Sequence, residues 1–136
     1  MPEKLRGLFT VFGLSGAEKL LPQQLSAGMK KRVELARAIC ADDAYLIGDE
    51  PFSALDLNQR QVLWNQWRSE VERNGRTALL VSHDVDEAIS VSDRILLLTA
   101  DAPTSIKLAF DRENGKFPDG VRAEALRAIL KTDPAG

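Results

Sequence analysis

Two adjacent carboxylates stand at the end of an apolar run in the middle of the chain. The stretch LIGDEPFSALD, residues 46–56, places Asp49 and Glu50 directly before Pro51. A buried carboxylate without a partner is costly, so a pair at such a place indicates a bound cation or a reaction. The simpler interpretation makes Asp49 a turn residue and Glu50 a solvated charge, and the pair alone does not decide between the two.

The start of a helix in LSAGMKKRVELARAI, residues 25–39, is a second candidate site. Ser26 can cap this helix, and Ala27 and Gly28 are small enough to let a ligand approach the backbone. Free N–H groups and the positive end of the helix dipole together favour a phosphate group. An ordinary capped helix is the alternative interpretation of these residues.

A histidine follows another apolar run, in LLVSHDVDEA, residues 79–88. Near a phosphate, a ring N–H of His83 could donate to a developing negative charge. A lone histidine is also commonly structural, so this motif by itself leaves both interpretations open.

Three short apolar segments must position these groups. Apolar and polar residues do not alternate along them, which is typical of strands buried on both faces. They therefore predict such strands over residues 44–48, 77–82 and 94–99. Helices over about 57–73 and 85–90 separate them, and a strand–helix–strand series indicates parallel pairing with right-handed crossovers. In such sheets the side chains just past the carboxyl ends of the strands face the ligand crevice.

The remaining segments indicate an α/β fold class with a helical region at the N-terminus. The spacing of apolar residues and the stop signals predict further helices over 3–12, 15–21, 28–41 and 122–131. Residues 105–110 are expected to return from 94–99 as a hairpin, because Asp101 and Pro103 lie between them.

Composition limits the kind of partner. Lysine and arginine number 18 against 20 acidic residues, which gives no general reason to expect nucleic-acid binding. The single Cys40 excludes an internal disulfide and fits a reducing compartment. No apolar stretch approaches the roughly 20 residues that span a bilayer, and the N-terminus lacks the apolar middle of a signal peptide. We therefore expect a cytoplasmic chain without direct membrane insertion.

Taken in order, these motifs resemble the second half of an ATP-binding cassette (ABC) transporter ATPase. The signature motif is LSAGM, the Walker B strand with its glutamate is AYLIGDE, the D-loop is SALD, and the switch histidine is His83. The longer stretches LSAGMKKRVELARAI, DEPFSALD and SHDVDEA resemble most the ATPase subunits of nitrate, sulfonate and taurine importers.

The resemblance implies ATP and Mg²⁺ as cofactors. Asp49 would hold the magnesium ion, Glu50 would polarise the attacking water, and His83 would be the second catalytic residue. The implied nucleotide-binding residues are Ser26, Ala27, Gly28, Met29 and Asp56. The implied fold is a partial P-loop-NTPase-like parallel sheet with a helical signature subdomain at the N-terminus. The expected parts are residues 1–41, the signature subdomain; 42–110, the ATPase core; and 111–136, a C-terminal helix and frayed tail.

The P-loop of this family, G-x-x-x-x-G-K-[ST], is absent from the 136 residues. The nearest match, GLSGAEKL at residues 13–20, has Glu18 in place of the second glycine and Leu20 in place of the hydroxyl residue. Ala27 also replaces the first glycine of the signature, which we expect to weaken a phosphate contact at most. We therefore expect the C-terminal portion of a nucleotide-binding domain, inactive unless a P-loop portion complements it.

The resemblance also implies partners and a place in the cell. These are an ABC permease, a second nucleotide-binding domain, and a peripheral position on the inner face of the cell membrane through the permease. The alternative is a non-catalytic interaction module that pairs with a complete ABC ATPase or a permease. The presence of both Glu50 and His83 favours the first interpretation, in which the chain is a portion of an ATPase.

The missing P-loop strand gives a prediction about the sheet. In the topology that the resemblance implies, this strand lies between residues 77–82 and 94–99. Without it, a slot of about 9.6 Å, two strand spacings, is expected to separate them. Residues 44–48 are expected to pair in parallel with the other edge of 77–82.

Overall fold

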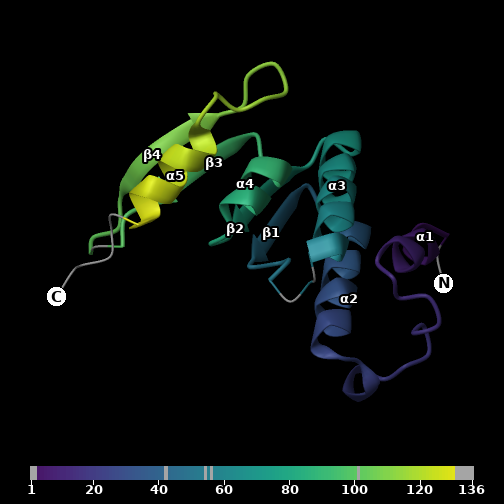
Figure 1. Cartoon of the computed structure of the whole chain (residues 1–136). Helices are drawn as coiled ribbons and strands as arrows, with labels where there is room; N and C mark the ends of the chain where they lie inside the picture. The colour runs from purple at the N-terminus through teal and green to yellow at the C-terminus, as the bar shows by residue number, and fades with distance from the viewer. Residues whose placement is uncertain (1–2, 42, 54, 56, 101, 131–136) are drawn as a thin grey trace. The chain divides into compact units, whose positions relative to one another are not determined.

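The computed structural model describes residues 3–41, 43–53, 55, 57–100 and 102–130 (Figure 1). The chain divides into two compact units, one ending at Ser82 and the other beginning at His83. This boundary differs from the expected ones after residues 41 and 110, and the assignment of functions to those three parts remains a prediction.

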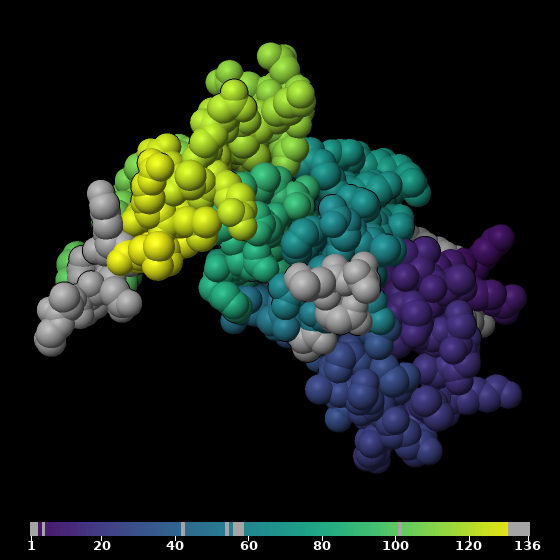
Figure 2. Space-filling view, in the orientation of Figure 1, coloured from purple at the N-terminus to yellow at the C-terminus, as the bar shows by residue number. Residues whose placement is uncertain are grey.

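The first unit contains three helices, a short 3-10 helix and two strands. In chain order they are α1 (Glu3–Val11), η1 (Pro22–Gln24), α2 (Ala27–Cys40), β1 (Tyr45–Asp49), α3 (Leu57–Arg73) and β2 (Thr77–Val81). The side chains of α1 and α2 adjoin, in purple and blue in Figure 2. Buried residues of α2 and α3 form much of the core, among them Leu35, Ile39, Leu63 and Trp67.

The two strands of the first unit form a parallel pair. The register runs from Tyr45 opposite Thr77 to Asp49 opposite Val81. This confirms that residues 44–48 and 77–82 are parallel neighbours, and the parallel sheet confirms the predicted α/β fold class.

The described elements of the first unit cover one face of this sheet. Leu46 is 4% exposed, whereas Tyr45, Ile47, Leu79 and Val81 are 72%, 79%, 61% and 56% exposed. Alternate residues of a strand point to opposite faces, so these four side chains share the second face. The prediction of strands buried on both faces is therefore wrong for β1 and β2, because no described element of the first unit covers that second face.

The second unit holds the rest of the described chain. Its elements are α4 (Val85–Val91), β3 (Arg94–Leu98), β4 (Ile106–Asp111) and α5 (Val121–Leu130). β3 and β4 pair antiparallel, which confirms the predicted hairpin, with an irregularity in register between Leu97 and Leu98. The prediction that residues 94–99 are buried on both faces is wrong, because Leu96 and Leu98 are 47% and 56% exposed. Phe110, Val121 and Ala125 form the centre of this unit's core.

The described strands form two separate two-stranded sheets, β1–β2 and β3–β4. β2 belongs to the first unit and β3 to the second. The width of the predicted slot between them remains a prediction, because the two units are described separately.

The predicted helix over residues 15–21 is wrong. Turns occupy this segment, and η1 begins at Pro22. Gly13 and Gly16 adopt left-handed backbone conformations, with φ of +60° and +88°, which interrupt a right-handed helix. The other predicted helices and strands agree with the structure to within a residue or so at each described end. None of the helices in the described ranges is long and apolar enough to cross a membrane.

Candidate functional site

The two carboxylates lie at the carboxyl end of β1. Asp49 is the last residue of the strand and its side chain is exposed. Gly48 precedes it at a point of close approach, since a Cβ there would lie 2.9 Å from Cδ2 of Leu80 and 3.1 Å from Cγ of Pro51. A larger residue would push the end of β1 away from these neighbours, so the glycine helps to fix where Asp49 stands.

Glu50 has an unusual backbone conformation. Its φ is +48°, in the left-handed region that residues other than glycine seldom adopt. Its N–H donates to the carbonyl oxygen of Val81, at 2.9 Å, and its side chain is half-buried. Such conformations persist only where surrounding structure holds them, and they gather at functional sites. No sequence pattern signalled this conformation.

Hydrogen bonds and a buried ring hold the turn that follows Glu50. The N–H and Oγ of Ser53 both donate to the Glu50 carbonyl oxygen, at 3.3 Å and 2.9 Å. Phe52 is fully buried, and its ring meets Trp67 edge-on, with centroids 5.9 Å apart. Sequence reasoning missed Phe52, although a large apolar residue inside a turn is itself a signal of a buried anchor. Asp56, which the resemblance implied as a nucleotide contact, lies outside the described residues.

The predicted cap of the signature helix is confirmed. Ser26 Oγ accepts a hydrogen bond from the Met29 N–H at 3.2 Å, and the Ser26 carbonyl oxygen accepts from Lys30 N–H at 2.9 Å. Ser26 and Ala27 are exposed, and Gly28 is half-buried. The helix therefore presents its N-terminal turn to solvent, where a ligand can reach it.

A small cavity of about 160 Å³ adjoins Asp49 within the first unit. Its lining residues are Lys31, Glu34, Leu35, Ala38, Ile47, Gly48, Asp49, Pro51 and Trp67. Lys31 and Glu34 form an ion pair at 3.8 Å. The structure thus brings α2, β1 and α3 together around one side of Asp49. Among the described residues, no group of three or more His, Cys, Asp or Glu side chains could hold a metal ion.

His83 is exposed and follows β2 by two residues. Asp84, next to it, caps α4 by accepting from the N–H groups of Asp86 and Glu87 at 2.9 Å and 3.1 Å. His83 is the first residue of the second unit, whereas Glu50 belongs to the first. That these two side chains act on the same phosphate remains a prediction.

Comparison with known proteins gives a consistent class. The family model described as ABC transporter matches residues 2–53. This match includes the signature motif, the strand that ends at Asp49, and Glu50 directly after it. The chain is thus similar to ABC transporter ATPases, both in these motifs and in its α/β fold.

Curated relatives include ATP-binding proteins of importers. The chain is 38% identical over 138 residues to the aliphatic sulfonates import ATP-binding protein SsuB 2 of Mesorhizobium japonicum. This alignment covers 97% of this chain and 55% of the relative. It is 35% identical to the sulfate/thiosulfate import ATP-binding protein CysA of the same organism, with 93% of this chain and 37% of the relative covered. The chain thus spans between about a quarter and about half of the length of the curated relatives it matches.

Solved structures show the same fold. A structure titled RNase-L Inhibitor superposes with a TM-score of 0.66 at 29% identity, covering 92% of this chain and 23% of that one. A structure of an archaeal ribosome recycling factor in complex with a ribosomal stalk protein superposes with a TM-score of 0.65 at 22% identity, covering 93% of this chain and 29% of that one. The second likeness concerns the fold alone.

Proposed function

We propose that this chain supplies the signature helix, the Walker B acids and the switch histidine of an ABC importer ATPase. ATP hydrolysis requires a P-loop portion in addition, because these 136 residues contain no G-x-x-x-x-G-K-[ST] stretch. The observation that carries the proposal is the end of β1, where Asp49 is exposed and Glu50 is held in a left-handed turn directly after it.

The donor chemistry at Asp49 fits Mg²⁺. Magnesium is usually bound through one or two carboxylates, with phosphate oxygens and waters as the other ligands. Asp49 offers one exposed carboxylate, and a magnesium ion bound with ATP would neutralise charge on the phosphates. The remaining ligands would come from the nucleotide and water, which suits a site with no larger ligand cluster among the described residues.

Glu50 is proposed as the residue that orients and polarises the attacking water. A carboxylate can accept a proton from water when it is held in place near the reacting group. The turn fixes the Glu50 backbone through Val81 on one side and Ser53 on the other. His83 is proposed to donate a hydrogen bond to the charge that develops on the transferred phosphate.

The signature helix is proposed to serve the ATP held by a second nucleotide-binding domain. Ser26, Gly28 and Met29 stand at or near the start of α2, where backbone N–H groups and the helix dipole favour phosphate. Ala27 keeps its backbone N–H and adds only a methyl group. Asp56 is proposed as a further nucleotide-binding residue.

The exposed face of the β1–β2 sheet supports the need for a further portion. Parallel sheets are almost always covered on both faces, yet Tyr45, Ile47, Leu79 and Val81 are all more than half exposed. Asp49 is exposed and alternates with Ile47, so it shares this face. A segment that covered the apolar residues would therefore also come close to the proposed magnesium ligand.

The partners follow from the same class. We propose that the assembled domain pairs with a second nucleotide-binding domain and docks on a permease, which would place it at the inner face of the cell membrane. The relatives named for sulfonate and sulfate import suggest an importer of an oxyanion-bearing solute, with solute choice made by the permease and its binding protein.

The test is ATP binding and phosphate release, with and without a P-loop portion. The isolated chain is expected to show no submillimolar affinity for Mg·ATP by calorimetry and no phosphate release. Adding the P-loop-containing N-terminal portion of the sulfonate importer relative is expected to produce both. Tight binding or turnover by the isolated chain would contradict the proposal. A complex that forms without any hydrolysis would favour the non-catalytic interaction module instead.

A further inference from the structure

Two arginines hold the two ends of the signature helix α2. Arg32 lies near its N-terminal end, and Arg76 reaches its C-terminal end from the turn before β2. Both side chains are half-buried and both bind main-chain carbonyl oxygens of another segment. These contacts join parts of the chain that lie 20 and 35–37 residues apart in the sequence.

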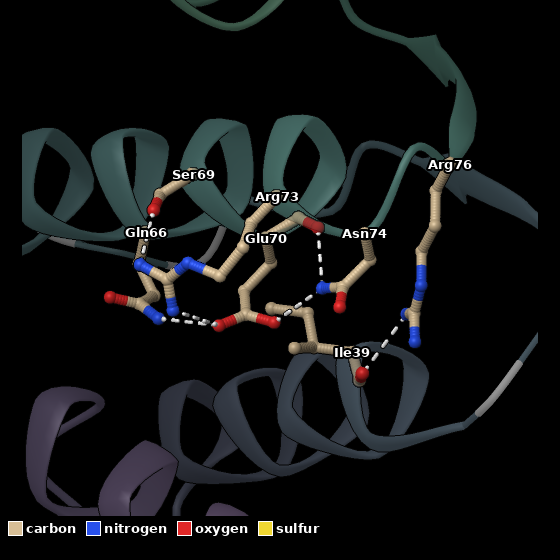
Figure 3. Close-up of polar contacts among 7 residues, drawn as sticks. All are labelled: Ile39, Gln66, Ser69, Glu70, Arg73, Asn74 and Arg76. Carbon is tan, nitrogen blue, oxygen red and sulfur yellow. Dashed lines mark hydrogen bonds and ion pairs between the residues drawn. The ribbon is translucent and has the colours of Figure 1, made fainter.

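Arg76 binds the last carbonyl groups of α2. Its Nη1 donates to the Ile39 carbonyl oxygen at 3.0 Å, and its Nη2 donates to the Ala41 carbonyl oxygen at 2.7 Å (Figure 3 shows the first). Carbonyl groups at a helix C-terminus lack intrahelical partners and carry the negative end of the dipole, so a guanidinium with two donors suits this place. The planar fork of arginine also fixes the direction of the contact.

The segment that carries Arg76 is itself fixed. The Arg76 N–H donates to the Val71 carbonyl oxygen at 3.0 Å, which ties the turn back to α3. Asn74 Nδ2 donates to the Glu70 carbonyl oxygen at 2.7 Å and to Glu70 Oε2 at 3.0 Å (Figure 3). Glu70 is 6% exposed, so this turn is anchored in the core. Arg76 therefore links α2 to a rigid part of the unit.

Arg32 makes the corresponding contact near the start of the helix. Its Nη1 donates to the carbonyl oxygen of Phe12 at 2.9 Å, and its Nε donates to that of Gly28 at 3.3 Å. Phe12 is 2% exposed, so the acceptor belongs to a buried segment. Gly13 has φ of +60°, and a Cβ at this residue would lie 3.1 Å from Arg32 Nη1. The glycine thus leaves room for the guanidinium.

We propose that Arg32 and Arg76 are positioning residues, which set the direction of α2 and so the place of Ser26 and Gly28. This inference rests on the proposed function, in which those two residues meet the phosphates of a partner's ATP. The helix has 14 residues and is about 21 Å long, so a tilt of about 10° at one end moves the other by roughly 4 Å. A displacement of that size would remove a hydrogen bond to phosphate.

A distance measurement tests the positioning role on the full chain without nucleotide. Spin labels are placed by Lys30→Cys and Asn65→Cys in a Cys40→Ser background, since both positions are exposed, one on α2 and one on α3. The parent is expected to give one narrow distance distribution. Arg76→Gln and Arg32→Gln are each expected to broaden it or shift its centre by about 2 Å or more. Arg76→Lys, which keeps one charged donor, is expected to restore part of the parent distribution.

Arg73→Gln is the matched control. The guanidinium of Arg73 contacts Ser69 Oγ at 3.0 Å and Glu70 Oε1 at 3.6 Å, both within α3 (Figure 3). This variant is expected to keep the parent distribution. A parent-like distribution in both glutamine variants would overturn the proposal, even if their melting temperatures fall. If Arg76→Gln does not fold, a parent-like distribution in Arg32→Gln together with one in Arg76→Lys would overturn it.

Catalysis in the complemented assembly gives an independent readout. Arg76→Gln is expected to lower kcat about tenfold and to leave the KM for ATP nearly unchanged, because the signature acts on ATP bound elsewhere. An equal kcat for Arg76→Gln and parent would contradict the positioning role. If the parent assembly shows no turnover, the proposed function fails, and the spin-label distances still decide whether the arginines position the helix.

Discussion

The backbone N–H of Glu50 donates to the carbonyl oxygen of Val81 at 2.9 Å, directly beyond the register pair Asp49–Val81. This bond extends the contact between the two parallel strands by one residue past the end of β1. It holds Glu50 in a left-handed conformation, with φ of +48°. The position of the proposed catalytic carboxylate is thus set by the neighbouring strand, and that strand leads on to His83 within two residues.

The left-handed conformation of Glu50 predicts how substitutions at this position change the stability of the chain. Glu50→Gly is expected to keep the free energy of unfolding or raise it by up to about 1 kcal/mol, because glycine adopts φ > 0 without steric cost. Glu50→Val is expected to lower it by about 1–2 kcal/mol, since a β-branched residue is strained there. Urea unfolding of both variants provides the measurement. Equal stability of Glu50→Gly and Glu50→Val would contradict a strained turn.

Phe52 is expected to be the main anchor of the turn after Glu50. Phe52→Ala removes a fully buried ring that packs on Trp67, so the free energy of unfolding should fall by about 3–5 kcal/mol. Phe52→Leu keeps an apolar side chain and should cost less than half of that. Tryptophan fluorescence during denaturant unfolding reports the change. A loss under 1 kcal/mol for Phe52→Ala would show that the turn is held by its hydrogen bonds alone.

The exposed sheet face is expected to make the isolated chain self-associate. Ile47 and Leu79 lie opposite each other and are 79% and 61% exposed. Exposed apolar patches of this kind promote association. The double variant Ile47→Gln, Leu79→Gln should reduce the oligomer fraction in light scattering and keep the circular dichroism spectrum. The same variant should bind a P-loop portion more weakly. If the parent stays monomeric at high concentration, the account of this face is wrong.

An ion pair between α4 and α5 gives a pH prediction for the second unit. Arg122 donates to both carboxylate oxygens of Asp86, at 2.5 Å and 2.9 Å. The hydrogen bond from Arg122 lowers the pKa of Asp86 below its ordinary value. The stabilisation is thus full above the unfolded pKa of about 3.9 and is lost as the pH falls through the lower folded pKa.

Arg122→Gln should remove that dependence. The measurement is the melting temperature of parent and variant from pH 6 to pH 2. The difference between them should be constant above about pH 5 and shrink at lower pH, and it should be modest because the pair is exposed. A difference that grows as the pH falls would contradict the assignment. Asp111 and Arg94 form a similar pair within the hairpin, and the pKa of Asp111 is lowered for the same reason.

The helices and strands that the sequence predicted well are those with local signals. Ser26 before an amphipathic run placed the start of α2, and the apolar runs placed each strand within a residue or so. The helix predicted over residues 15–21 was wrong because Ser15 and Pro22 resemble helix boundaries. The left-handed conformations of Gly13 and Gly16, which interrupt a helix, depend on the surrounding fold.

The site was predictable in its residue types and less so in its geometry. The motif identified Asp49 and Glu50, but their positions depend on contacts with Val81 and Ser53 that have no local signature. The exposure of Ile47 was missed because an unalternated apolar strand normally has cover on both faces. The roles of Arg32 and Arg76 depend on carbonyl groups far away in sequence, which a pattern cannot show.

The most direct test of the central claim is ATP turnover by the complemented assembly carrying Glu50→Gln. This variant is expected to bind Mg·ATP with the affinity of the parent and to release phosphate at least about a hundredfold more slowly, because it loses the proton acceptor and keeps the turn. Glu72→Gln, an exposed residue of α3 paired with Arg68, is the control and should match the parent. A Glu50→Gln assembly that hydrolyses ATP at the parent rate would contradict the account.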